Sequence, residues 1–242
     1  MIGALQHARR TPGLGKARLA FWDFSSGSCA VVLSLLYRYR VEGLEHVPRT
    51  GPAIFIANHQ SLLDPVIHGM AVTDRAPRPM AKESLFRNPA FGAILRGLGC
   101  ISVREDGGSN RDSMRAALEE LAANRCVMIY PEGTRSPDGE VKPFQRGIEL
   151  LVRKSGAPVV PMGIDGAFDI WPTGRRLPRL RGRIWTTIGE PIGADELARL
   201  FADPARGLDA LRDRVDALVQ RCRSRLSGGS AEAGESRGAW LS

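Results

Sequence analysis

The chain has 242 residues, of which 43% are hydrophobic and 25% are charged, a composition that fits one globular domain with a sizeable core. Its net charge of +8 and its pI near 9.9 predict attraction to a polyanion such as nucleic acid, an anionic membrane surface or a phosphorylated substrate. The four cysteines are scattered, without a Cys-x-x-Cys motif or paired histidines, which argues against a zinc site or a disulfide framework.

Residues 1–40 combine basic ends with an aromatic and aliphatic middle, and Asp23 is their one acidic residue. This pattern is typical of an amphipathic helix that lies in the headgroup region of a membrane. An N-terminal helix packed on the domain is the alternative, and both can hold at once. The longest continuous apolar run, Cys29 to Leu36, is shorter than the roughly 18–20 residues needed to cross a bilayer. We therefore expect the segment to lie on a membrane without spanning it.

The next expected elements are two short strands and a helix, at Val41 to Leu44, Ala53 to Ala57 and about Leu62 to Val72. The second strand leads directly into Asn58 and His59, and Asp64 follows five residues after the histidine. Histidine titrates near neutral pH and suits a general base, which a carboxylate can orient. Positions five apart on one helix point about 140° away from each other. We therefore expect His59 in the strand-to-helix turn and Asp64 in the first helical turn, where Ser61 or Asp64 can cap the helix. The alternative is a loop histidine beside an ordinary capping aspartate.

Two cations stand where short apolar runs give way to turns. Lys82 follows Pro79 to Ala81, and Arg104 follows Gly99 to Val103. Such positions suit the rim of a binding site, with a solvated surface charge as the alternative. Ser109 to Asn124 then predicts an amphipathic helix that packs on the core.

A continuous apolar run at Cys126 to Tyr130 predicts a strand buried on both faces. It ends in a turn where Gly133 lets the backbone approach a ligand, Thr134 offers a hydroxyl and Arg135 offers a planar fork for phosphate oxygens. Open α/β sheets bind ligands at the carboxyl ends of their strands, so this turn is a candidate phosphate site. A Gly-Thr turn with an exposed arginine is the alternative.

The last third of the chain predicts further elements of the same kind: a helix from Pro143 to Gly156, strands at Pro158 to Met162 and Arg183 to Ile188, and a long amphipathic helix through residues 208–226. Trp171 to Trp185 holds five arginines and no acidic residue, which suits a lipid surface or a single-stranded nucleic acid. A solvated basic hairpin is the alternative. From residue 227 onward the chain turns to Ser, Gly, Ala and Glu, and we expect it to be disordered.

Four of these blocks, in this order, resemble the signature segments of the glycerolipid acyltransferases, and of the lysophosphatidic acid acyltransferase type in particular. They are Asn58-His59-(four residues)-Asp64, the segment ending in Arg104, the segment from Tyr130 to Arg135, and Pro158 to Met162. Tyr130 stands where the family more usually has phenylalanine, which adds a hydroxyl. Weaker likeness extends from Val41 to Ile192. Given the resemblance of these blocks, the arginine-rich segment from Trp171 to Trp185 favours a lipid surface or an acidic acyl carrier as its partner.

We expect an α/β fold: a single domain with a mixed, mostly parallel sheet flanked by helices, preceded by the amphipathic, membrane-associating helix. The expected division is an N-terminal membrane-associating segment at 1–40, an acyltransferase domain at 41–226 and a disordered tail at 227–242. The resemblance implies transfer of a fatty acyl group from a thioester, acyl-CoA or acyl carrier protein, to the sn-2 hydroxyl of 1-acylglycerol 3-phosphate (lysophosphatidic acid), giving phosphatidic acid.

In this picture His59 is the catalytic base and Asp64 orients it. The residues expected to bind substrate are Asn58, Lys82, Arg104, Glu132, Gly133, Thr134 and Arg135. Because a carboxylate repels phosphate, Glu132 is expected to bind a hydroxyl or to fix an arginine. Ser61 lies close enough to propose an acyl-enzyme, but we rank direct transfer first, since a thioester needs no covalent activation. No metal and no cofactor are expected.

The resemblance places the protein on the cytoplasmic face of the cell membrane, bound peripherally to an anionic surface and not to nucleic acid. An alternative keeps the chemistry and changes the acceptor to a lysophospholipid, a lyso-ornithine lipid or glycerol 3-phosphate. A remote alternative is a non-catalytic basic module that binds membranes or nucleic acid. That alternative leaves His59 and Asp64 unexplained.

Overall fold

A seven-stranded sheet forms the centre of the computed structural model, which describes residues 11–13, 15–72, 75–104 and 111–228. Its strand order is β1-β7-β6-β2-β5-β3-β4. The strands are β1 (Arg40–Glu42), β2 (Ala53–Ala57), β3 (Arg78–Lys82), β4 (Ile101–Val103), β5 (Cys126–Ile129), β6 (Val159–Asp165) and β7 (Trp185–Ile188). Among these strands only β6 and β7 pair antiparallel. The predicted mixed, mostly parallel sheet is therefore confirmed.

Strand β2 lies in the middle of the sheet, between β6 and β5, and all five of its residues are fully buried. Its side chains alternate between the two faces: Ile54 and Ile56 belong to one core cluster, and Ala53, Phe55 and Ala57 to another. A strand that is covered on both faces needs a continuous apolar sequence, which explains why the signal at Ala53–Ala57 was clear.

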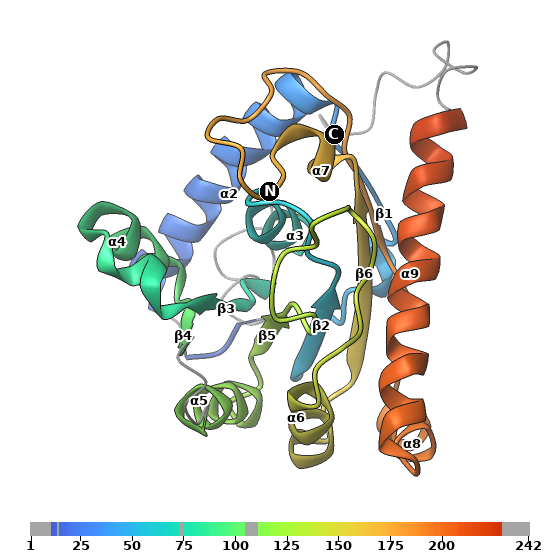
Figure 1. The fold of residues 1–242 in the computed structure, drawn as a ribbon. Helices are drawn as coiled ribbons and strands as arrows, with labels where there is room; N and C mark the ends of the chain where they lie inside the picture. The colour runs from blue at the N-terminus through green and yellow to red at the C-terminus, as the bar shows by residue number, and fades with distance from the viewer. Residues whose placement is uncertain (1–10, 14, 73–74, 105–110, 229–242) are drawn as a thin grey trace.

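Helices cover both faces of the sheet (Figure 1). The Ile54 face packs against residues of α5, α6, α8 and α9, whereas α3 and the end of α2 pack on the other face. The helices are α2 (Lys16–Tyr37), α3 (Asp64–Ala71), α4 (Pro89–Leu98), α5 (Arg111–Ala122), α6 (Gly147–Ser155), α7 (Ala167–Ile170), α8 (Ala194–Leu200) and α9 (Pro204–Gly228), with short 3-10 turns at Leu44–His46 and Glu83–Arg87.

Several boundaries differ from the sequence prediction. The short helices α4, α7 and α8 were not predicted, and α9 begins at Pro204, earlier than expected, and ends at Gly228. The expected tail falls almost entirely on residues 229–242, which lie outside the described residues, as do residues 1–10 of the N-terminal segment and the first two residues of the helix predicted from Ser109.

Helix α2 is apolar around most of its circumference and so differs from a simple amphipathic helix. At about 100° per residue, its buried residues fall on one side: Leu19, Trp22, Leu33 and Tyr37. Its exposed apolar residues fall on the opposite side: Phe24, Val31, Val32, Leu35 and Leu36. One stripe therefore packs on the domain while the other faces outward, so the packed-helix alternative holds beside the membrane-seeking pattern.

The expectation that no segment is long and apolar enough to cross a bilayer is wrong for α2. Among the described residues, this 22-residue helix meets that criterion by length and composition alone. Counting continuous apolar runs missed it, because Asp23 and the Ser and Gly residues of positions 25–28 interrupt the run without making the helix polar.

The parallel pairing brings several loops to one edge of the sheet. Strands β2, β5, β3, β4 and β6 all run in the same direction, so their carboxyl ends meet at that edge. His59 follows β2, Glu132 follows β5, and Lys82 and Arg104 stand at the ends of β3 and β4. This edge is where an open α/β sheet of this kind binds ligands.

Candidate active site

His59 and Asp64 meet at the carboxyl end of β2. The Nδ1 atom of His59 lies 2.8 Å from Oδ2 of Asp64. The imidazole is 18% exposed, whereas the carboxylate is fully buried. His59 lies in the turn and Asp64 is the first residue of α3, as the spacing predicted. The ring is thus partly buried and partly exposed, so a substrate can reach it from the exposed side.

The carboxylate of Asp64 is fixed by the turn that precedes it. Its Oδ2 accepts the backbone N–H of Gln60 at 2.6 Å and that of Ser61 at 2.7 Å, in addition to the His59 ring. Because two backbone N–H groups already use Oδ2 as an acceptor, we infer that Nδ1 of His59 also donates to it and that Nε2 holds the free lone pair. Within the described part of the chain, Nε2 has no hydrogen-bond partner. The expected helix cap is absent, since residue 63 is the N-cap and makes no side-chain bond.

Asn58 and Gln60 tie the turn to the neighbouring strand β6. The Asn58 side chain donates to the carbonyl of Ile164 at 3.0 Å and accepts its N–H at 2.9 Å. The Gln60 amide donates to the same carbonyl at 2.8 Å. Asn58 is only 2% exposed, and both of its polar atoms are occupied. Asn58 therefore has a structural task, and its contact with substrate stays a prediction.

Glu132 also holds the turn. Its Oε1 accepts the backbone N–H of His59 at 2.7 Å, and its Oε2 accepts that of Lys142 at 3.1 Å. The residue is 5% exposed. These two backbone bonds join the turns after β2 and β5, and the contact of Glu132 with a substrate hydroxyl stays a prediction.

Tyr130 packs on the His59 ring, and His68 contacts Tyr130. The rings of His59 and Tyr130 stack with their centroids 4.2 Å apart and an interplanar angle of 26°. The Tyr130 hydroxyl lies 3.1 Å from Nδ1 of His68. Burial lowers the pKa of His68 to about 4, mainly by desolvation, so this second imidazole is neutral near pH 7. Asp64 fixes one edge of the His59 ring, and Tyr130 supports its face.

The turn after β5 lies against the histidine. The backbone N–H of Ser136 donates to the carbonyl of His59 at 2.6 Å, so Arg135 lies next to the candidate base. Arg135 is half-buried, while Gly133 and Thr134 are exposed. Gly133 has φ +75°, and an added Cβ would collide with the Gln145 side chain, so glycine is required here.

Lys82 and Arg104 lie farther along the same edge. Lys82 pairs in register with Val103, the residue before Arg104, so the two cations end adjacent strands. Both are exposed. The structure therefore brings His59, Asp64, Glu132 and Arg135 together at β2 and β5, and it places Lys82 and Arg104 on the β3–β4 side of that edge.

Two of these features were missed by the sequence analysis. The Glu132 bond joins residues 73 positions apart, and a backbone N–H partner leaves no mark in a linear pattern. His68 was set aside as a lone histidine on a mixed helix face, and its contact with Tyr130 depends on the packing of α3 against β5. The hydroxyl that distinguishes Tyr130 from phenylalanine was the available clue.

Known proteins resemble this chain in sequence and in fold. A family model described as Acyltransferase matches residues 38–165. The 1-acyl-sn-glycerol-3-phosphate acyltransferase BAT2 of Brassica napus is 32% identical over 172 residues, which are 70% of this chain and 49% of that protein. The 1-acyl-sn-glycerol-3-phosphate acyltransferase of Pseudomonas aeruginosa is 28% identical over 78% of this chain and 70% of its own length. The chain spans about half the length of the plant relatives that it matches.

A solved structure shares the fold over nearly the whole chain. The crystal structure of PlsC from Thermotoga maritima, a 1-acyl-sn-glycerophosphate (LPA) acyltransferase, superposes with a TM-score of 0.70 at 26% identity. The match covers 96% of this chain and 89% of that one.

The pKa of Glu132 makes stability depend on pH. Burial, the larger effect, raises this pKa from 4.5 to about 7 against the two backbone hydrogen bonds, which favour the ionised form. The folded protein therefore holds the proton more tightly than the unfolded chain, and the stability linked to Glu132 is lost as pH rises through about 7. We expect wild type to lose on the order of 2–3 kcal/mol relative to Glu132→Gln between about pH 5 and pH 8.

Urea unfolding of both proteins at the two pH values measures this difference, and Glu190→Gln, an exposed glutamate after β7, serves as the matched control. Equal pH dependence in wild type and Glu132→Gln would show that Glu132 stays ionised in the fold.

Proposed function

The chain belongs to the acyltransferase family, and we propose that it moves a fatty acyl group from a thioester, acyl-CoA or acyl carrier protein, to the sn-2 hydroxyl of 1-acylglycerol 3-phosphate. The product is phosphatidic acid, and the reaction belongs to phospholipid biosynthesis. The observation that carries the proposal is the 2.8 Å contact between Nδ1 of His59 and the buried Asp64 carboxylate. It leaves Nε2, the basic nitrogen, on the accessible side of the ring.

In the proposed reaction, Nε2 of His59 takes the proton of the acceptor hydroxyl as its oxygen attacks the thioester carbonyl carbon. The tetrahedral intermediate then collapses with cleavage of the carbon–sulfur bond, and the imidazolium returns its proton to the departing thiolate. Asp64 stabilises the imidazolium and keeps the ring in the required tautomer. General base catalysis of this type contributes about 10²- to 10⁴-fold to the rate.

The acceptor phosphate is assigned to the turn after β5. Arg135 supplies two parallel N–H donors that match phosphate oxygens, and the bond between Ser136 and the His59 carbonyl holds its backbone beside the base. Gly133 and Thr134 are exposed on the same turn. Arg104 and Lys82 serve as further cations along the edge. Holding the hydroxyl near the thioester carbonyl supplies a large part of the rate, because a bimolecular step becomes effectively unimolecular.

Direct transfer is supported over an acyl-enzyme on Ser61. That side chain is fully buried, its Oγ donates to the carbonyl of Trp171 at 2.9 Å, and it accepts the N–H of Leu63 at 3.2 Å. A hydroxyl engaged in this way holds the turn together and is poorly placed to attack a substrate.

Membrane association is assigned to α2 and to the N-terminal segment 1–40 of which it is part, with 41–226 as the acyltransferase domain. One apolar stripe of α2 packs on the domain and the opposite stripe is exposed, which fits a helix lying at an interface. We place the protein peripherally on the cytoplasmic face of the cell membrane, where anionic lipids attract its net positive charge.

The first test concerns the base. We expect His59→Ala and Asp64→Asn to lower the rate of acyl transfer by at least about 100-fold, since one removes the base and the other its ionised partner. Transfer of labelled acyl groups to 1-acylglycerol 3-phosphate measures the rate, and circular dichroism checks the fold. His46→Ala and Asp195→Asn, both far from the site, are the matched controls. Wild-type rates in either site variant would contradict the base assignment.

The second test concerns the phosphate. Arg135→Ala is expected to lower kcat/KM for 1-acylglycerol 3-phosphate by about 10-fold or more, and to have a much smaller effect with 1-acylglycerol, which lacks the phosphate. Arg115→Ala on α5 is the control for lost positive charge. A panel of lysophospholipid, lyso-ornithine lipid and glycerol 3-phosphate acceptors identifies the preferred acceptor in the same assay. An equal loss with both acylglycerols would remove Arg135 from the phosphate site.

A further inference from the structure

The connection between α7 and β7 carries an unusual concentration of unpaired positive charge. Its residues 175–183, called the arginine loop below, have the sequence Arg-Arg-Leu-Pro-Arg-Leu-Arg-Gly-Arg. Within the described part of the chain, Arg175 donates to the carbonyl of Leu177 at 3.0 Å, and the other four arginine side chains make no hydrogen bond or ion pair. Five cations within nine residues repel one another, so the loop is suited to an anionic partner.

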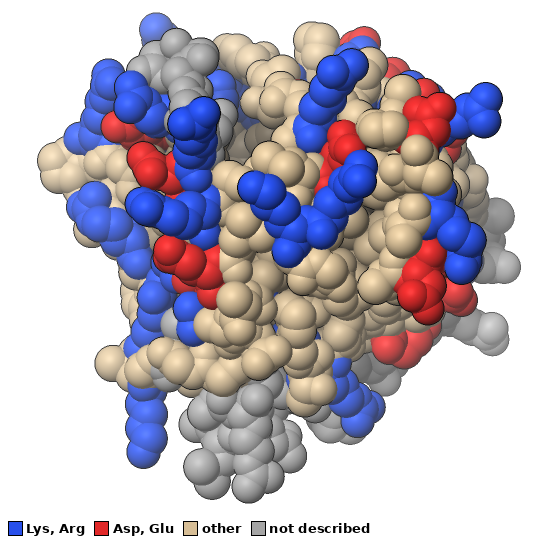
Figure 2. Space-filling view, turned by 90° about the horizontal axis from the view of Figure 1, so that it is seen from below, with Lys and Arg blue, Asp and Glu red and all other residues tan. Residues whose placement is uncertain are grey.

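The surface of α9, by contrast, balances its charges. The arginines of α9 are paired with carboxylates, as in the contacts of Arg214 with Glu196, of Arg223 with Glu140 and of Arg225 with Glu42. Figure 2 shows the end of the molecule opposite the arginine loop, where acidic and basic residues are interspersed. The loop thus differs from α9, where arginines also recur but have carboxylate partners.

Exposed leucines alternate with these arginines. Leu177 is 75% exposed and Leu180 is 73% exposed, about as much as Leu35 (78%) and Phe24 (75%) on the outer stripe of α2. Burying such apolar side chains is favourable. A surface that offers both guanidinium groups and isolated leucines matches the headgroup region of a bilayer, where phosphates lie directly above acyl chains.

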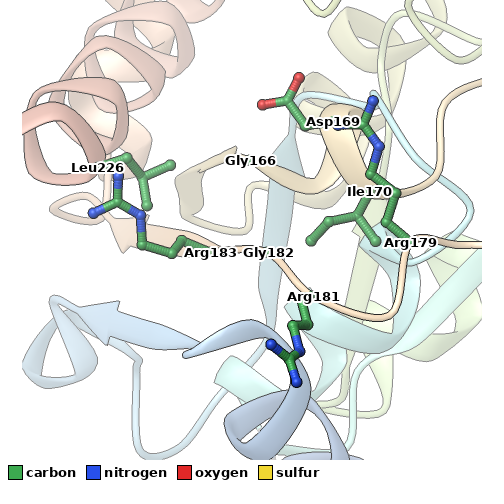
Figure 3. A pocket seen from close by; sticks show the side chains of 8 residues that line it. All are labelled: Gly166, Asp169, Ile170, Arg179, Arg181, Gly182, Arg183 and Leu226. Atoms are coloured by element: carbon green, nitrogen blue, oxygen red, sulfur yellow. The ribbon is translucent and has the colours of Figure 1, made fainter.

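The arginine side chains point in different directions (Figure 3). They line a shallow hollow of about 170 Å³ beside α7 and the end of α9. In Figure 3, Arg179 extends toward Asp169, Arg181 toward the ribbon of α2, and Arg183 toward Leu226. Guanidinium groups that diverge in this way cannot close on one phosphate. They suit several phosphates spread over a surface.

The loop adjoins both α2 and the candidate active site. The N–H of Ile184 donates to the carbonyl of Tyr37, the last residue of α2, at 3.1 Å, and Figure 1 shows the loop beside that end of α2. At the other end of the connection, the Trp171 carbonyl accepts the Ser61 hydroxyl at 2.9 Å. A membrane contact here lies on the same edge of the molecule as His59, so a lipid acceptor reaches the base from the bilayer.

We propose that the arginine loop is a second membrane contact, in which Leu177 and Leu180 insert among the lipids while the arginines bind their phosphates. Together with α2 it fixes two points of contact and so orients the His59 edge toward the bilayer. The inference rests on the membrane association proposed above, and it adds a surface that is remote in sequence from the N-terminal helix.

The test is binding of the full chain to vesicles of phosphatidylcholine with phosphatidylglycerol, measured by cosedimentation. We expect Leu177→Ser with Leu180→Ser to weaken binding by about 10-fold or more, and Arg176→Gln with Arg179→Gln and Arg181→Gln to weaken it similarly. The control variant, Leu150→Ser with Arg199→Gln, changes an exposed leucine and an exposed arginine at the opposite end and is expected to bind like wild type. Loop variants that bind like wild type overturn the proposal.

A second measurement on the unaltered protein is independent of how the variants fold. Hydrogen exchange of residues 175–183 is expected to slow when anionic vesicles are added, and unchanged exchange overturns the proposal. Transfer to a short-chain, soluble 1-acylglycerol 3-phosphate separates the two hypotheses. With this soluble acceptor the loop variants are expected to react at wild-type rates, because no membrane contact is needed. If the proposed acyl transfer is wrong, wild type has no activity with this acceptor either. If the variants keep vesicle binding and instead raise the KM for acyl carrier protein, the loop docks a protein and the proposal fails.

Discussion

The hydrogen bond between His59 and Asp64 is the constraint on which the site depends, because it decides which ring nitrogen is basic. The bond exists only if the turn between β2 and α3 folds back on itself, so that a residue five positions downstream meets the ring. Backbone N–H groups of residues 60 and 61 hold the carboxylate in that position. The turn thus fixes its own carboxylate, and the carboxylate fixes the imidazole.

Neighbouring strands then fix the turn. Asn58 and Gln60 bind the backbone of β6, and Glu132 binds the N–H of His59 from the turn after β5. Tyr130 packs against the face of the ring. These contacts come from both sides of β2, the fully buried central strand, so the imidazole is held by three parallel strands at once. Such preorganisation allows the base to act without a reorganisation cost at the moment of proton transfer.

Much of the fold was predictable because the signals are local. The continuous apolar runs of β2 and β5 predicted buried parallel strands, and the five-residue spacing of His59 and Asp64 placed one in the turn and the other in the helix.

Contacts between segments distant in the chain were not predictable in this way. Glu132 and Asn58 bond to backbone groups that are distant in the sequence, and any sequence supplies such partners. For α2, the pattern predicted an amphipathic helix, but it did not show that two opposite sides are apolar, one packed on the domain and one exposed. The substrate roles stay predictions for all seven residues: Asn58, Lys82, Arg104, Glu132, Gly133, Thr134 and Arg135.

The protonation state of the His59 ring tests the central claim most directly. Nitrogen-15 NMR of the histidine side chains, with His59→Ala to assign the signals, distinguishes a protonated from an unprotonated ring nitrogen. Above the titration range of His59, we predict a proton on Nδ1 and a free lone pair on Nε2 in wild type, and loss of this preference in Asp64→Asn. A proton on Nε2 in wild type, or the same tautomer balance in both proteins, would contradict the claim that Asp64 sets the base.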